Sequence, residues 1–169
     1  MFRRLRETGP GLLVPLAWTF VTAAHLGLVA TRTVLIAHVV MTVLLAAFAL
    51  LSYGDMQEGV LRAWLWVIVV GFVVTLVGTA SFLVPGPTAA MQTITVVGWL
   101  VVPGVALAYT GRAVETVGAR RLYLAAGGLS LAGAVVYLAG SVMPVALLVG
   151  LTLGNVGQTA GILHAVVKY

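Results

Sequence analysis

Two histidines inside apolar segments are the side chains best suited to hold a cofactor. His25 comes near the end of one apolar segment and His38 near the start of the next. Because a helix rises ~1.5 Å per residue, both imidazoles would lie at a matched depth in the outer third of a membrane. An ionisable side chain at that depth is a functional candidate, and imidazole is the common axial ligand of haem iron. We therefore predict a b-type haem held by His25 and His38.

Arg32 and Met41 complete the predicted haem site. Arg32 is the only arginine expected at the outer surface, where bidentate hydrogen bonding suits it to the haem propionates. Met41 follows His38 by three residues and so shares its helix face, and Met is the common alternative to His as an axial ligand. The predicted function is electron transfer or sensing in the outer half of the bilayer, with a membrane redox partner.

The two histidines have two other interpretations. With Met91 and Met143, which start later apolar segments at a comparable depth, they would form a copper site, because thioether and imidazole ligands suit Cu(I). Alternatively, each imidazole would only hydrogen-bond to a neighbouring helix, as polar side chains in membranes do. His164, near the inner end of the last segment, lies too deep to join them, and we expect it to be structural.

A second polar group lies in the last apolar segment and suggests another class of function. Asn155, Gln158 and Thr159 would lie in mid-membrane, where their polar atoms need partners. Together with Gln92 they would line a polar cavity, which makes the chain a pore or carrier for a small solute. Hydrogen bonding between helices is the alternative role of these amides.

The chain lacks groups that several membrane activities require. All four carboxylates are expected outside the apolar segments, whereas proton-coupled transporters need an intramembrane acid. Lys168, the single lysine, stands at the very end, so a retinal Schiff base is excluded. The absence of cysteine excludes thiolate metal sites and disulfides. The carboxylates are Glu7, Asp55, Glu58 and Glu115.

The composition places these residues in a membrane protein. Of the 169 residues, 62% are hydrophobic and 8% are charged, against about 25% charged residues in a soluble domain. A spanning helix needs about 20 apolar residues. We predict an all-α, polytopic bundle of six transmembrane helices in one domain, at about 12–30, 33–52, 61–84, 90–110, 122–140 and 145–167.

The lysines and arginines predict the orientation of this bundle. All of them except Arg32 fall on one set of connections or at the chain ends. Because positive residues stay on the cytoplasmic side, both termini should be cytoplasmic (N-in/C-in) in a cytoplasmic membrane of the prokaryotic type. The lipid bilayer is then the partner of the basic residues, through its anionic headgroups, and nucleic acid is not.

Repeats and glycines indicate how the helices pack. Segments 49–71 and 106–128 match weakly, which suggests three repeated helical hairpins. Small residues recur at three- and four-residue spacing and allow close approach of helices, within the bundle or in a homo-oligomer. Attachment to a larger membrane complex, as an accessory subunit, is the third functional alternative. The small residues are Gly150, Gly154, Gly157 and Gly161, with Gly104 and Ala108 in an earlier segment.

The stretch His38-Val-Val-Met41 followed by Gly54-Asp55-Met56 resembles the second helix of heme-copper oxidase subunit I. In that family a histidine in the outer third ligates a low-spin haem, and outer-surface arginines meet its propionates. The resemblance implies these roles for His38 and, by position, for Arg32. It covers one helix and the following loop, and the chain has half the helices of the family and no His–Tyr copper site. It therefore implies a cytochrome-like protein without oxygen chemistry.

Overall fold

The chain folds as six long α-helices. The computed structural model describes residues 2–168 and, within the first helix, the side chains from Gly11 onward. No strand occurs among these residues, so the predicted all-α class is confirmed. The helices are α1 (Phe2–His25), α2 (Thr31–Ser52), α3 (Gly59–Ala80), α4 (Thr88–Ala113), α5 (Val117–Leu138) and α6 (Val145–Lys168), with a short 3-10 helix, η1 (Ala139–Ser141), before α6.

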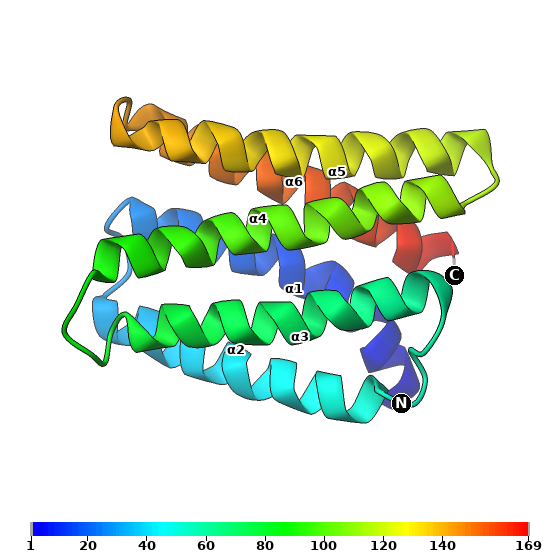
Figure 1. The fold of residues 1–169 in the computed structure, drawn as a ribbon, viewed down its shortest axis with the longest axis horizontal. Helices are drawn as coiled ribbons and strands as arrows, with labels where there is room; N and C mark the ends of the chain where they lie inside the picture. The colour runs from blue at the N-terminus through cyan, green and yellow to red at the C-terminus, as the bar shows by residue number, and fades with distance from the viewer. Residues whose placement is uncertain (1, 169) are drawn as a thin grey trace.

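Five of these helices, α2 to α6, are long and apolar enough to cross a membrane. The first helix contains a shorter apolar stretch, Gly11–His25. The helices run antiparallel, and both chain ends lie at one end of the bundle, called the terminal end below (Figure 1). The opposite, distal end holds the α1–α2, α3–α4 and α5–α6 connections.

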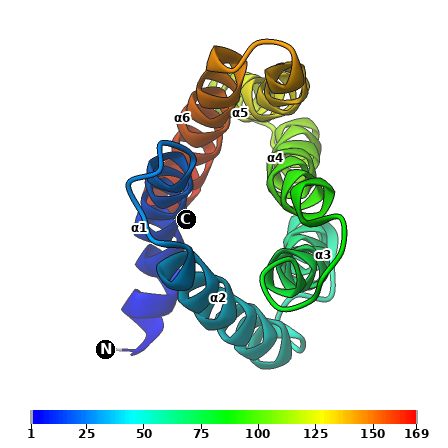
Figure 2. The same cartoon turned by 90° about the vertical axis from the view of Figure 1, so that its left-hand side faces the viewer.

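Viewed along their axes, the helices follow one another around an elongated ring (Figure 2). Helix α5 packs closely on both α4 and α6, whereas α2 packs on α3 alone among its neighbours. Short connections favour contact between sequential helices, and sequential helices are neighbours from α2 to α6. Helix α1 differs, because it packs on α6 and closes the ring from the other side.

A glycine turn ends α1. Gly27 has φ +72°, a left-handed conformation that glycine adopts without strain. The Gly27 N–H bonds to Ala24 O at 3.0 Å and the Leu28 N–H to Ala23 O at 3.0 Å, the pattern of a Schellman helix end. The predicted continuation of the first helix to residue 30 is therefore wrong. The expected turn at residues 31–33 is wrong as well, since Thr31 already begins α2.

The other helix bounds differ from the prediction by a few residues. Helix α3 ends at Ala80, because residues 81–84 form turns ahead of Pro85-Gly86-Pro87. The expected inner loop 111–121 is much shorter, since α4 continues to Ala113 and α5 begins at Val117. A helix continues through polar residues when its packing favours it, so hydropathy alone ends it too early.

Glycines set the close packing of α4, α5 and α6. A Cβ at Gly157 would lie 2.5 Å from Ala126 O, and one at Gly150 would lie 2.6 Å from Gly133 O, both on α5. Gly154 and Gly161 face Leu100 and Leu107 of α4. The four glycines of the predicted α6 stripe therefore pack against other helices of the same chain, and all four are buried. The expectation that this stripe joins two copies or a larger complex is corrected accordingly.

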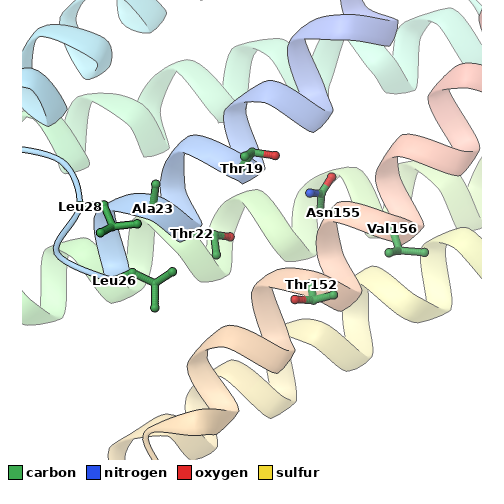
Figure 3. Close-up of a pocket in the computed structure, with 8 residues that line it drawn as sticks. All are labelled: Thr19, Thr22, Ala23, Leu26, Leu28, Thr152, Asn155 and Val156. Carbon is green, nitrogen blue, oxygen red and sulfur yellow. The ribbon is translucent and has the colours of Figure 1, made fainter.

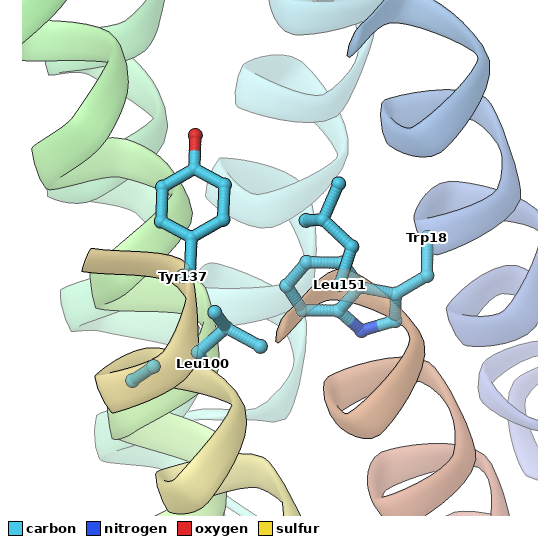
Figure 4. Packing of buried hydrophobic residues seen from close by; sticks show 5 residues of the cluster. Trp18, Leu100, Tyr137 and Leu151 are labelled. Carbon is cyan, nitrogen blue, oxygen red and sulfur yellow. The ribbon is translucent and has the colours of Figure 1, made fainter. Parts of the chain in front are cut away.

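Side chains from four helices fill the space enclosed by α1, α4, α5 and α6. Trp18, Leu100, Tyr137 and Leu151 form one buried cluster (Figure 4). Leu100 and Leu151 are completely buried, and Trp18 is 6% exposed. This cluster anchors α1 on the rest of the bundle.

Candidate functional site

Gln158 lies at the centre of a buried hydrogen-bond network. Its carbonyl oxygen accepts from Trp18 Nε1 at 3.0 Å. Its amide nitrogen donates to Trp99 O at 2.7 Å and to Ser130 Oγ at 2.9 Å, and Ser130 Oγ donates to Leu100 O at 2.6 Å. Gln158 is 2% exposed. Because its oxygen and both amide hydrogens are engaged, Gln158 joins α1, α4, α5 and α6 and does not line a solute cavity.

The network repairs a defect in α4. Pro103 lies inside this helix and has no N–H, so the carbonyl of Trp99, four residues earlier, has no partner in its own helix. Gln158 supplies that partner from α6, and Ser130 bonds the next carbonyl, Leu100 O. Proline is tolerated in membrane helices when neighbouring side chains satisfy the freed carbonyls in this way.

This arrangement predicts energetic coupling between Gln158 and Pro103. Gln158→Leu should lower the free energy of unfolding by about 2 kcal/mol, because it leaves the Trp18 N–H and Trp99 O without partners. In a Pro103→Ala background the restored N–H of residue 103 can pair with Trp99 O, so the same substitution should cost clearly less. A double-mutant cycle of unfolding midpoints in mixed detergent–SDS micelles measures the difference. Equal costs in both backgrounds would contradict the repair role.

An open groove lies between α1 and α6 toward the distal end, and four of its eight lining residues are polar. It has a volume of about 360 Å³ and is shown in Figure 3. Asn155 stands ten residues after the start of α6, which places it ~15 Å along that helix, near mid-depth if α6 crosses a membrane. The lining residues are Thr19, Thr22, Ala23, Leu26, Leu28, Thr152, Asn155 and Val156.

The three threonines present acceptors to this groove. Thr19 donates its hydroxyl hydrogen to Pro15 O at 2.7 Å, Thr22 to Trp18 O at 2.8 Å and Thr152 to Leu148 O at 2.8 Å. With these hydrogens directed to their own helices, the hydroxyl oxygens keep lone pairs for a ligand. Figure 3 shows the three hydroxyl groups turned toward the space between the helices.

Asn155 presents the complementary donor. Its side-chain oxygen accepts the Thr159 hydroxyl at 3.0 Å, which fixes the amide so that the nitrogen is directed toward α1 (Figure 3). Among the residues that line the groove, Asn155 has the only side-chain N–H group. Thr159 therefore orients the site without lining it, and Gln92 is exposed in the first turns of α4, away from the groove.

The two predicted haem histidines contact different helices. His25 is the last residue of α1, whereas His38 lies seven residues after the start of α2. The two imidazoles therefore do not start from the matched depth that the haem prediction assumed. Its Nδ1 lies 2.8 Å from Val21 O and its Nε2 lies 2.8 Å from Tyr137 Oη on α5. Val21 O only accepts, so Nδ1 carries a proton. Both nitrogens of His25 are thus occupied.

His38 packs between α2 and α3. Its Nδ1–H donates to Val34 O at 2.9 Å, and its ring meets Phe82 edge-on at 5.4 Å between centroids. The ring edge with Nε2 lies against Gly78, where an added Cβ would be 2.9 Å from Nε2. No hydrogen bond to Nε2 is found among the described residues, so His38 has a free lone pair that faces the backbone of α3.

The remaining predicted ligands are spread over the distal end. Arg32 is exposed in the first turn of α2, and Met41 is half-buried on the His38 face. Met91 is half-buried in the first turn of α4, and Met143 is 54% exposed in the connection before α6. Within residues 11–168 no group of three or more His, Asp or Glu side chains could hold a metal ion.

Sequence reasoning missed Trp18, Ser130 and the threonines of α1. Tryptophan in a membrane helix is most common at the interface, whereas Trp18 donates across the bundle to Gln158. The spacing of Thr19, Thr22 and Leu26 on one face of α1 was the available signal, and it becomes informative only once α6 is known to be the neighbour.

Protein-family models, curated proteins and solved structures gave no match to this chain, so the likeness to heme-copper oxidase subunit I stays a prediction from the residues alone.

Proposed function

We propose that the chain is a six-span membrane protein with both ends in the cytoplasm, and that it passes a small neutral solute without proton coupling. The α1–α6 groove would bind the solute during passage. The observation that carries the proposal is that the Asn155 amide shares a groove of about 360 Å³ with three threonine oxygens, two from α1 and one from α6. Ligand pockets for small molecules begin at about this size.

The polarity of the groove selects the class of solute. Its lining holds no charged side chain, so an ion would lose its hydration without receiving a counter-charge. A neutral molecule with hydroxyl or amide groups can accept from Asn155 and donate to the threonine oxygens. Leu26, Leu28 and Val156 add apolar surface to the lining, which suits the carbon skeleton of such a molecule. Small polyols and amides fit these requirements.

The test is solute entry into proteoliposomes after an osmotic step, followed by light scattering. Glycerol and urea represent the two solute types, and protein-free liposomes give the background permeability. We expect faster entry of at least one neutral solute and no added permeability to sodium or chloride. Background rates for both neutral solutes would overturn the proposed function.

Haem b is the second candidate, and the free lone pair of His38 favours it. The geometry supports it less than the groove. His25 and His38 contact different helices, and His25 Nε2 is already bonded to Tyr137. As arranged, the two residues do not fit a haem with two histidine ligands, and His38 would need α2 and α3 to separate at Gly78. A copper site from His25, His38, Met91 and Met143 requires a similar rearrangement of His25.

An absorption spectrum of detergent-purified protein from haem-supplemented cells tests this candidate. If haem b binds through His38, a Soret band appears, the α and β bands sharpen on reduction with dithionite, and His38→Ala abolishes them while His164→Ala preserves them. Metal analysis of the same sample tests copper. A colourless, metal-free sample would exclude both cofactors.

The accessory-subunit alternative expects a partner to contact the glycines of α6. These glycines are buried against α4 and α5, so a partner would have to use another surface. It predicts no solute flux and a partner that co-purifies with the chain. The flux measurement above therefore separates it from the carrier.

A further inference from the structure

A second cavity lies at the terminal end of the bundle, far along α6 from the solute groove. Its volume is about 400 Å³, and it is formed by the first turn of α5 and the last turns of α6. His164 and Lys168 are four residues apart and so share one face of α6. The lining residues are Thr116, Gly118, Ala119, His164 and Lys168.

The charges around this cavity favour an anion. Lys168, whose side chain carries an ammonium group, is one of the lining residues, and the exposed Arg120 and Arg121 follow in the first turns of α5. No carboxylate lines the cavity. Glu115, which is exposed, directly precedes Thr116 and is the one acidic residue of the α4–α5 connection. Among the described residues, Lys168 is thus the one lysine, arginine or carboxylate side chain in the lining.

The uncharged lining adds hydrogen-bond donors. Thr116 precedes the first residue of α5, and its hydroxyl makes no capping bond to the helix. The first N–H groups of α5 have no partner within the helix and suit anionic oxygens. His164 is held by an edge-on contact with Tyr123 at 5.4 Å between ring centroids, so its ring keeps a fixed orientation beside the cavity.

We propose that this cavity binds the phosphate group of an anionic phospholipid at the membrane surface. The proposal does not depend on the solute groove, because it uses different residues at the other end of α6. A phosphate offers several acceptor oxygens to the Lys168 ammonium, the Thr116 hydroxyl and the helix N–H groups. Basic pockets between helices on the cytoplasmic side are a recurrent form of headgroup site. Such a headgroup would fasten the α5–α6 pair to one leaflet.

The test is the unfolding temperature of the full chain in a neutral detergent with added ligand, since a ligand that binds the folded state raises it. The probes are short-chain phosphatidylglycerol, diacylglycerol of the same chain length, and inorganic phosphate. We expect stabilisation by phosphatidylglycerol and none by diacylglycerol. Stabilisation by inorganic phosphate at the same concentration would assign the site to free phosphate and overturn the lipid source.

Three variants locate the binding. Lys168→Gln removes the cavity's cation, and Gly118→Leu fills the cavity without changing charge, at a position where an added Cβ meets nothing within 4 Å. Each should weaken the apparent affinity for phosphatidylglycerol about five-fold. Arg62→Gln is the matched control, because Arg62 is exposed in the first turn of α3 at the same end of the bundle. An equal loss in the control, or no stabilisation of the unsubstituted chain, would overturn the proposal.

Discussion

Gly157→Leu is expected to destroy the packing of α5 on α6 and to lower the free energy of unfolding by about 3 kcal/mol. The added Cβ would lie 2.5 Å from Ala126 O and 3.0 Å from Leu129 Cβ. The first of these atoms belongs to the backbone of α5, which cannot turn away as a side-chain end can. The helices would have to separate, and this would also break the hydrogen bonds of Gln158, the next residue.

The matched control is Gly128→Leu. Gly128 lies on α5, is exposed, and would have no atom within 4 Å of an added Cβ. Unfolding in mixed micelles of increasing SDS content, followed by tryptophan fluorescence, compares the two variants. We expect Gly128→Leu to unfold within about 0.5 kcal/mol of the unsubstituted chain. If both variants lose stability equally, the close approach of α5 and α6 at Gly157 is not what stabilises the bundle.

The position of the helices was predictable because hydropathy and length are local properties. Runs of about 20 apolar residues are typical of spanning helices; a helix lies at each of the six predicted places, and five of these helices are long and apolar enough to cross a membrane. The glycine spacing of α6 also predicted close packing correctly, since the spacing of small residues defines a helix face. The bounds failed at Gly27, where one left-handed glycine ends α1 ahead of further apolar residues.

The neighbours of each helix were not predictable from spacing. A short connection suggested that α1 lies on α2, but the Trp18–Gln158 hydrogen bond, the Gly11 contact with Leu163 and the His25–Tyr137 bond hold α1 against α5 and α6. These contacts join residues more than 100 positions apart, and the periodic patterns of the sequence do not indicate such pairs.

The candidate site depended on those neighbours and so was only partly predicted. Asn155 lines the α1–α6 groove, whereas Gln158 does not, because its donors and acceptor meet Trp18, Trp99 and Ser130. Whether an amide in a membrane helix serves a ligand or another helix depends on what stands opposite. For Asn155 no hydrogen bond from the amide nitrogen is found among the described residues, since only its oxygen is bonded, to Thr159, and this leaves the nitrogen for a solute.

Asn155→Leu is expected to reduce solute entry into proteoliposomes about ten-fold. It removes the only side-chain N–H group among the groove residues while keeping the number of side-chain heavy atoms and the branch at Cγ, and one lost hydrogen bond to a neutral group is worth about 1 to 1.5 kcal/mol. Gln92→Leu makes the same chemical change at an exposed position outside the groove and should leave entry unchanged. An equal reduction in the two variants would trace the loss to amide removal in general and contradict a role for the groove.

Thr159→Val tests whether the orientation of the Asn155 amide, and not only its presence, matters for solute entry. Thr159 does not line the groove, and its hydroxyl only donates to Asn155 Oδ1. Without this bond the amide can rotate and present either end to α1, so the donor is available for part of the time. Solute entry should then fall by about two-fold, between the values for the unsubstituted chain and Asn155→Leu. If solute entry falls as far as in Asn155→Leu, Thr159 itself contacts the solute. The path of the solute would then extend along α6 beyond the groove.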